Sequence, residues 1–152
     1  MAPNGTALGM VMDFDFEFLS DVFCMFRCTF VASGIERFME EAYQQGRQWD
    51  MVILDPPKLA PNKKVLNRAR GKYEALNEAA IRLVKPGGLF MTCSCSAAMT
   101  QSSDFVSMVV SAARKSRRQV TIIRSAGAAA DHTMSPSYEL GRYLTNVLVS
   151  VK

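Results

Sequence analysis

Two cysteines separated by one serine are the residues of this chain whose type and spacing best suit nucleophilic chemistry. Cys93 and Cys95 end the apolar run 89–95, which is typical of a β-strand. Residues two apart in a strand point to the same face, and they differ in depth by about 6–7 Å because each residue rises about 3.3 Å. Cys95 then lies at or past the strand end, and it is the better candidate nucleophile. Cys93 lies one step deeper and is better explained as a small buried apolar residue.

A carboxylate followed by two prolines ends a second apolar run, 51–54. Pro56 and Pro57 cannot continue a ladder and leave nearby carbonyls without partner N–H groups, so these oxygens could accept hydrogen bonds from a flat ligand. Asp55 itself has two interpretations that periodicity does not separate. Its carboxylate either faces a ligand in a cleft or caps the segment that follows.

The elements that must position these groups alternate between strand and helix. Apolar spacing predicts helices over residues 35–45, 71–84 and 105–113, and strands over 29–31, 51–54, 89–95, 120–124 and 143–151. The continuous run 51–54 is typical of a strand buried on both faces. This order predicts an α/β fold with a largely parallel sheet, and the short connection between the last two strands makes that pair antiparallel. Ligands of open α/β sheets bind beyond the carboxyl ends of the strands, where Asp55 and Cys95 lie.

Composition and charge describe one ordinary globular domain with a basic side. The chain has 152 residues, 49% hydrophobic and 21% charged, which excludes a disordered tail and a fibrous repeat. Five bases occur in residues 114–124, and six bases without an acid occur in residues 58–72: Lys58, Lys63, Lys64, Arg68, Arg70 and Lys72. Such clusters suit a polyanion such as nucleic acid, and a solvated helix face explains them equally well.

The remaining signals predict a protein of a reducing compartment without a membrane span or a metal. Four cysteines without a ladder of pairs indicate free thiols, and the first basic residue, Arg27, comes too late for a targeting signal. We therefore expect an intracellular soluble protein, cytoplasmic or organellar. Cys24 and Cys28 have no further ligand nearby, and His132, the only histidine, is better explained by a structural hydrogen bond than by a proton relay.

The ordered motifs resemble those of class I S-adenosylmethionine-dependent RNA methyltransferases, and more narrowly the group that makes 5-methylcytosine in large-subunit ribosomal RNA. The resemblance covers roughly residues 28–152. The motifs that carry it are Asp55-Pro56-Pro57-Lys58-Leu59, Gly71-Lys72-Tyr73 with Leu76-Asn77, Pro86-Gly87-Gly88, Thr92-Cys93-Ser94-Cys95-Ser96, Asp131-His132 and Gly141-Arg142-Tyr143-Leu144.

The resemblance implies a Rossmann-like domain, a reaction and a set of site residues. Cys95 would add to carbon 6 of cytosine, which suits a thiolate because it attacks well and also leaves readily. Asp55, with the backbone of Pro56, would hold the pyrimidine edge close to the methyl group of S-adenosylmethionine, and the base would have to leave its stack. The basic residues that would bind RNA phosphates are Lys58, Lys63, Lys64, Arg68 and Lys72. Tyr73 and Asn77 would border the cleft, and core packing is the alternative for Tyr73.

Departures from the family pattern predict a truncated domain with the first strands missing. The glycine-rich loop and the acidic residue that binds the ribose have no counterpart, and Ser33 and Gly34 stand where the family has a pair of aspartates against the adenine. We interpret residues 1–27 as an atypical segment and 28–152 as the C-terminal part of the methyltransferase domain. An exposed sheet edge would favour self-association. Two alternatives remain: an inactive remnant that binds RNA or a partner, and methylation of an exocyclic amine, for which Cys95 would be dispensable.

Overall fold

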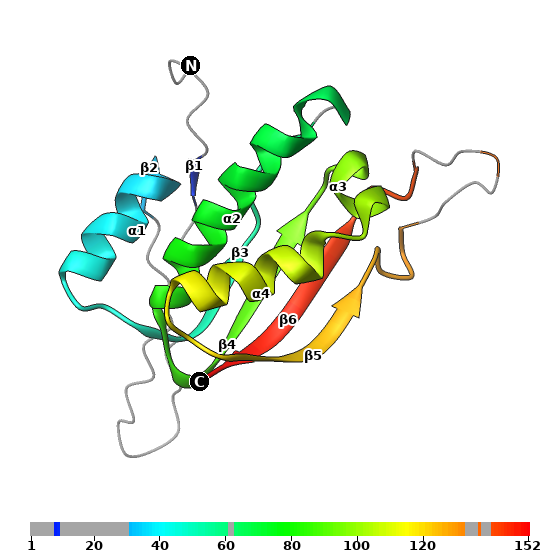
Figure 1. Cartoon of the computed structure of the whole chain (residues 1–152). Coiled ribbons are helices and arrows are strands. Elements are labelled where there is room, and N and C mark those ends of the chain that lie inside the picture. Colours follow the sequence, from blue (N-terminus) through cyan, green and yellow to red (C-terminus); the bar gives the residue numbers. More distant parts are fainter. Residues whose placement is uncertain (1–7, 10–30, 61–62, 133–136, 138–140) are drawn as a thin grey trace, which may run out of the picture.

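The computed structural model describes residues 8–9, 31–60, 63–132, 137 and 141–152. Its elements, in chain order, are β1 (Leu8–Gly9), β2 (Ser33–Gly34), α1 (Ile35–Gln44), β3 (Trp49–Leu54), the 3-10 turn η1 (Lys63–Val65), α2 (Leu66–Arg82), β4 (Val84–Ser94), α3 (Ala97–Ser102), α4 (Phe105–Lys115), β5 (Val120–Ala126) and β6 (Thr145–Val151) (Figure 1).

Four strands form the main sheet in the order β3-β4-β6-β5. The pair β3–β4 is parallel, and β6 is antiparallel to both β4 and β5. The prediction of an antiparallel final pair is therefore confirmed. The prediction of a largely parallel sheet is wrong, because β6 inserts between β4 and β5 and separates two strands that run in the same direction. Only one parallel pair remains in this sheet.

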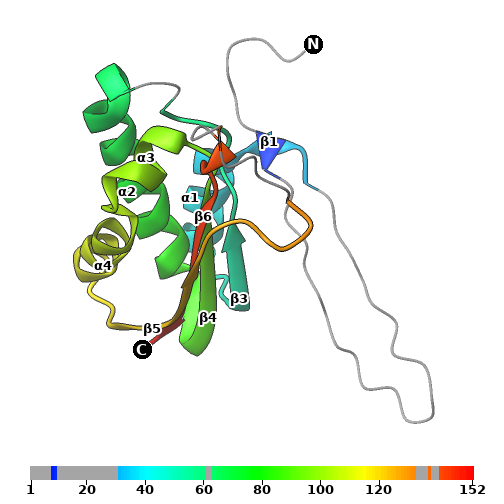
Figure 2. The same cartoon turned by 90° about the vertical axis from the view of Figure 1, so that its right-hand side faces the viewer.

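The core lies between one face of the sheet and the helices (Figure 2). Alternate residues of the central strands point toward α2 and α4, as the period of two in a strand requires. Burying one large apolar side chain of this kind stabilises the fold by about 1.5–3 kcal/mol. The largest buried side chains of this layer include Phe90, Val147, Val149, Ile81, Met108 and Val109.

The other face of the sheet is exposed at β3. Met51 and Ile53 are 44% and 62% exposed, whereas Leu54 is 2% exposed. The prediction that this strand is buried on both faces is wrong, because the helices of the described residues pack against one face only (Figure 2). Within the described residues β3 pairs with β4 alone, so its outer edge has no partner strand there.

Most predicted elements form, with shifted boundaries. Helix α1 matches its prediction, α2 begins five residues earlier than expected and includes Gly71, and α3 was not expected. Residues 29–30 of the first predicted strand, with Cys24 and Cys28, lie outside the described residues. No helix in the described part of the chain is both long enough and apolar enough to cross a membrane.

The two glycines of the Pro86-Gly87-Gly88 motif serve the entry into β4. Gly87 has a φ of +82°, a conformation that side chains disfavour. A Cβ on Gly88 would lie 2.7 Å from the carbonyl oxygen of Asp50 in β3. Gly87 therefore allows the backbone conformation at this point, and Gly88 allows β3 and β4 to approach closely near their amino ends, so this motif is explained by backbone geometry and packing.

Candidate active site

The carboxyl ends of β3 and β4 lie side by side and bring together the two groups singled out by their chemistry. Leu54 is opposite Thr92 in the parallel register, so the next residues, Asp55 and Cys93, are neighbours. Leu54 and Thr92 face the helices and are buried, and Asp55 and Cys93 therefore lie on the other face. Strand β4 ends at Ser94, which places Cys95 just past the strand end, as predicted.

The two thiols have the same burial class and differ in their position along the chain, because Cys93 lies within β4 and Cys95 follows its end. Both are free and half-buried. Burial raises the pKa of the Cys93 thiol to about 11, and the nearby Asp55 carboxylate adds to the rise because it repels the thiolate. Cys93 is therefore protonated at neutral pH and poorly suited to attack. This supports the choice of Cys95 as the candidate nucleophile.

The loop that follows Asp55 folds back onto α2 and α3. Pro56 is buried, and Ala60, fully buried, packs against Ala69 of α2 and Ala98 of α3. These contacts hold the loop at the same end of the sheet as Cys95. Lys58 belongs to the same loop, and its side chain is exposed.

Basic residues continue from this loop along the start of α2. Lys64, Arg68 and Lys72 are exposed and follow at intervals of four residues, so they lie along one side of η1 and the first turns of α2. Lys63 begins η1. Lys72 also approaches Glu36 at 3.7 Å. Lys58, Lys64, Arg68 and Lys72, which are all exposed, form what we call the basic stripe.

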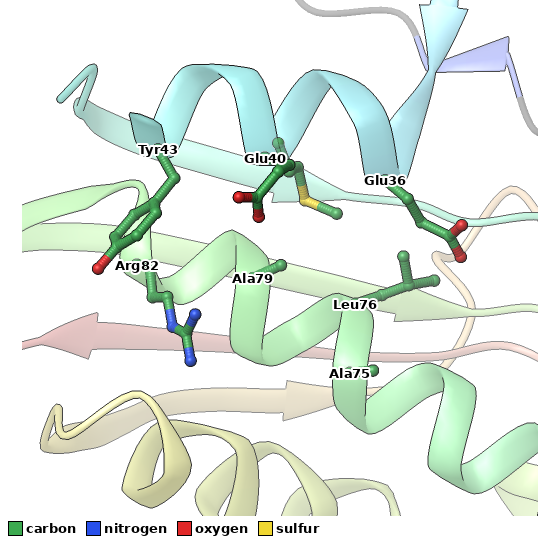
Figure 3. A pocket seen from close by; sticks show the side chains of 8 residues that line it. Glu36, Glu40, Tyr43, Ala75, Leu76, Ala79 and Arg82 are labelled. Carbon is green, nitrogen blue, oxygen red and sulfur yellow. The ribbon is translucent and has the colours of Figure 1, made fainter. Parts of the chain in front are cut away.

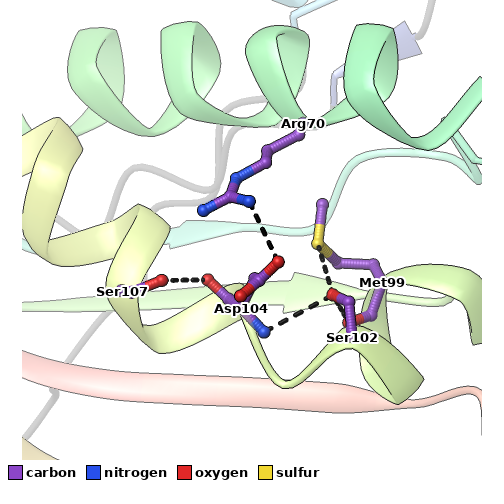
Figure 4. Close-up of polar contacts among 5 residues, drawn as sticks. All are labelled: Arg70, Met99, Ser102, Asp104 and Ser107. Carbon is purple, nitrogen blue, oxygen red and sulfur yellow. Dashed lines mark hydrogen bonds and ion pairs between the residues drawn. The ribbon is translucent and has the colours of Figure 1, made fainter.

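One basic residue of the segment 58–72, Arg70, has a structural role instead. The guanidinium of Arg70 pairs with the carboxylate of Asp104 at 2.9 Å, which ties α2 to the start of α4 (Figure 4). Ser107 and Ser102 complete this cluster, because the Ser107 hydroxyl donates to the carbonyl of Asp104 and the Asp104 amide donates to the Ser102 hydroxyl. Arg70 therefore supports the helices and is kept apart from the basic stripe.

Tyr73 and Asn77 lie in the packed interior. Both side chains are 0% exposed, and their predicted place beside the substrate stays a prediction. The Tyr73 ring meets Phe105 edge-on at 6.0 Å, and the Asn77 amide donates to the carbonyl of Tyr73 at 2.7 Å. Periodicity had left core packing open as an alternative for Tyr73, and burial against α4 decides for it.

Two serines of the cysteine motif make contacts that the sequence analysis did not assign. Ser94 and Ser96 alternate with the cysteines, so they point to the opposite, buried face, where both bond to the Tyr73 hydroxyl at 3.0 Å. The signal for this was present in the sequence. Thr92, Ser94 and Ser96 place three hydroxyls on one face of an otherwise apolar strand, and buried hydroxyls need partners.

The residues present fit the reacting end of the implied cofactor better than its adenosine end. Asp55 and Pro56 follow the end of β3 and Cys95 follows the end of β4, and these are the ends at which a methyl group and a pyrimidine would meet. Ser33 and Gly34 form β2, and the Ser33 hydroxyl donates to the Gly34 carbonyl at 3.3 Å. Neither offers a carboxylate, so at this point of the described chain only hydroxyl and backbone groups could contact an adenosine.

Other features of the described residues lie apart from the strand ends. A cavity of about 160 Å³ lies between α1 and α2, lined by Glu36, Glu40, Tyr43 and Arg82 among others (Figure 3). Its two glutamates would repel a nucleic acid. His132 meets the ring of Tyr143 edge-on at 5.3 Å, and no three metal-binding side chains gather in the part of the chain described.

Solved structures place this arrangement in a known fold. The structure is similar to a candidate SAM-dependent methyltransferase from Streptococcus mutans, with a TM-score of 0.60 at 17% identity, and to a candidate methyltransferase solved with SAH, with a TM-score of 0.58 at 20% identity. Each likeness covers 78% of this chain and 30% of the other. The chain holds part of an α/β methyltransferase fold.

Sequence comparison relates the chain to a more specific group of methyltransferases than the fold does. The chain is 38% identical over 125 residues to ribosomal RNA large subunit methyltransferase I of Alteromonas mediterranea, and 38% identical over 118 residues to that of Vibrio parahaemolyticus. It is related to these methyltransferases. The matches cover 82% and 78% of this chain and 31% and 30% of those proteins, so the chain spans about a third of their length. No protein-family model matches it.

The shared face of Asp55 and Cys93 makes a prediction about thiol reactivity. Replacing Asp55→Asn removes the charge that opposes the Cys93 thiolate, so the pKa of Cys93 falls and its alkylation by iodoacetamide at pH 9 accelerates severalfold. Peptide mass spectrometry follows each cysteine separately. Asp50→Asn, at the opposite end of β3, is the control and leaves the Cys93 rate unchanged. Equal rates in all three proteins would show that Asp55 does not act on this thiol.

Proposed function

We propose that this chain carries the reacting groups of an S-adenosylmethionine-dependent RNA methyltransferase that acts on carbon 5 of cytosine in large-subunit ribosomal RNA. The observation that carries the proposal is that Asp55 and Cys95 both follow the carboxyl ends of two neighbouring parallel strands. The similarity to ribosomal RNA large subunit methyltransferase I supports the choice of substrate.

Cys95 supplies the nucleophile in this reaction. Its thiolate forms a bond to carbon 6 of the base, and the electron pair of the 5,6 double bond moves to carbon 5, which becomes nucleophilic. S-adenosylmethionine, when bound, supplies the methyl group that carbon 5 takes. A base then removes the proton from carbon 5, the double bond re-forms, and the thiolate leaves carbon 6.

Asp55 selects and orients the pyrimidine. A carboxylate accepts a hydrogen bond from the exocyclic amino group of cytosine, whereas uracil presents an oxygen at the same position. The buried Pro56 keeps the turn rigid, and its carbonyl is the backbone group proposed to accept a hydrogen bond from the base. The target base reaches these groups only when it is unstacked or single-stranded.

Binding of S-adenosylmethionine and the loss of Cys95 test the enzyme together. We expect micromolar binding by calorimetry, with S-adenosylhomocysteine as competitor. Methyl transfer to carbon 5 of cytosine in RNA should fall by about 10³-fold or more in Cys95→Ser, since the nucleophile is lost, while Cys93→Ser keeps most of the rate.

Three results would contradict this function. No cofactor binding by the folded chain, with RNA binding retained, would favour the inactive remnant. Full activity of Cys95→Ala would favour methylation of an exocyclic amine, for which no thiol adduct is needed. Methylation at carbon 5 that depends on Cys93 rather than Cys95 would reverse the roles assigned to the two thiols.

The basic stripe is proposed to bind RNA phosphates. Replacing Lys58→Gln and Arg68→Gln together should weaken RNA binding and lower the slope of log affinity against log salt by about 1.4, because each contact with a single strand contributes about 0.7. Arg114→Gln with Arg117→Gln removes the same charge at the end of α4, at the opposite end of the sheet, and should change the slope little. Equal losses in both double variants would indicate non-specific attraction.

Self-association through β3 is a further part of the proposal. Within the described residues the outer edge of this strand has no partner strand, and the exposed Met51 and Ile53 offer apolar surface to a second copy. Ile53→Lys adds a charge on this face and should shift the chain toward monomer in sedimentation velocity. Identical sedimentation of the wild type and Ile53→Lys over a range of concentrations would contradict self-association through β3.

A further inference from the structure

A closed set of hydrogen bonds lies directly behind Cys95. The Ser94 hydroxyl donates to the Tyr73 hydroxyl at 3.0 Å, and the Ser96 amide donates to the Ser94 hydroxyl at 3.2 Å. The hydroxyls of Tyr73 and Ser96 are 3.0 Å apart. Because the phenol already accepts from Ser94, its own hydrogen is left to donate to Ser96. All three side chains are at most 1% exposed.

Ser96 also joins the two strand ends that carry the reacting groups. The amide of Ala60 donates to the Ser96 hydroxyl at 3.2 Å. Ala60 ends the loop that begins at Asp55, and it is fully buried. One serine hydroxyl therefore links the loop of the carboxylate to the loop of the thiol, which are 36 residues apart along the chain.

Helix capping does not explain this serine. Ser96 is the N-cap residue of α3, a place where serine is favoured because its hydroxyl accepts from an amide of the first helical turn. Its side chain makes no such bond here. The hydroxyl is bonded to Tyr73 and Ala60 instead, so it serves the contact between elements rather than the helix.

The arrangement holds Cys95 from both sides. Its two neighbours are bonded into the interior, and its own half-buried side chain lies on the opposite face. The Tyr73 ring is itself packed edge-on against Phe105. Buried hydrogen-bond networks of this kind strengthen one another, and the loss of one member leaves the others unsatisfied.

We propose that Tyr73, Ser94 and Ser96 form a positioning clamp that sets the Cys95 thiol against Asp55 and thereby the rate of nucleophilic addition to the base. This inference rests on the proposed function and adds to it. The three residues touch neither the base nor the cofactor. They act through the backbone on either side of Cys95, and small displacements of reacting atoms lower rates strongly.

The first test separates rate from binding. Tyr73→Phe keeps the packed ring and removes only the hydroxyl, and Ser96→Ala removes the link to Ala60. With the full chain, S-adenosylmethionine and a cytosine-containing RNA, each variant should lower the single-turnover rate by about 10- to 100-fold and leave the KM for RNA within twofold. The double variant should lose no more than the slower single variant, because both act through one network.

The second test does not depend on activity. Hydrogen exchange of the Ala60 amide, followed by NMR, should accelerate at least tenfold in Ser96→Ala, because that amide loses its acceptor. The amides of Phe90 and Val149 in the sheet should exchange as in the wild type, which excludes general destabilisation. Ser102→Ala in α3 and Tyr43→Phe on the surface of α1 remove hydroxyls outside the clamp, and they should change neither readout.

The outcomes distinguish the clamp from the function on which it rests. An active wild type whose Tyr73→Phe and Ser96→Ala variants keep their full rates would overturn the clamp alone. Unchanged exchange at Ala60 in Ser96→Ala would also overturn it. A wild type that does not methylate cytosine, or a fully active Cys95→Ala variant, would overturn the proposed function and with it the catalytic role of the clamp.

Discussion

The parallel pairing of β3 with β4 is the contact on which the rest of this molecule depends. It sets Leu54 opposite Thr92, and this register brings the residues that follow each strand to one edge of the sheet. A slip by one residue would turn the Asp55 carboxylate toward the helices, because side chains alternate between faces. At the other end of the strands, where Gly88 permits a close approach to Asp50, the register shifts between Trp49 and Met51.

Strand β4 uses its two faces for different purposes. One face carries Cys93 and leads to Cys95, whereas the other carries Thr92 and Ser94 into the interior. The strand thereby presents thiols toward the candidate active site and hydroxyls toward α2. A run of alternating cysteine and serine is well suited to this, because both are small and neither forces the helix away from the sheet.

The match with relatives over about a third of their length accords with a sheet covered on one side in the described residues. Exposed Met51 and Ile53 are apolar residues for which the described chain provides no cover. The hydrophobic pattern of β3 predicted that both faces of the strand are buried. It shows that both faces carry apolar side chains, but not whether other elements cover them. The part of the basic stripe on α2, Arg68 and Lys72, does not depend on how the other face of β3 is covered, since α2 packs on the opposite face of the sheet.

Much of the local structure followed from the sequence. Apolar spacing located α1, α4 and the cores of β3 and β4, and the motifs selected Asp55 and Cys95. Apolar spacing did not reveal that β6 lies between β4 and β5, because strand order depends on contacts between distant segments and leaves no local pattern. Spacing placed Tyr73 on the apolar side of its helix, and burial against α4 decided between core packing and the cleft.

What the sequence determined by itself is which residues lie together along a strand or a helix, because alternation and helical period are properties of the local backbone. It also determined the chemical types available at each strand end. The tertiary structure alone decided that the Cys93 thiol lies beside Asp55, and that the hydroxyls of Ser94 and Ser96 meet Tyr73. These are contacts between residues some 20 to 40 positions apart, and only packing of the whole fold brings them within hydrogen-bonding or electrostatic range.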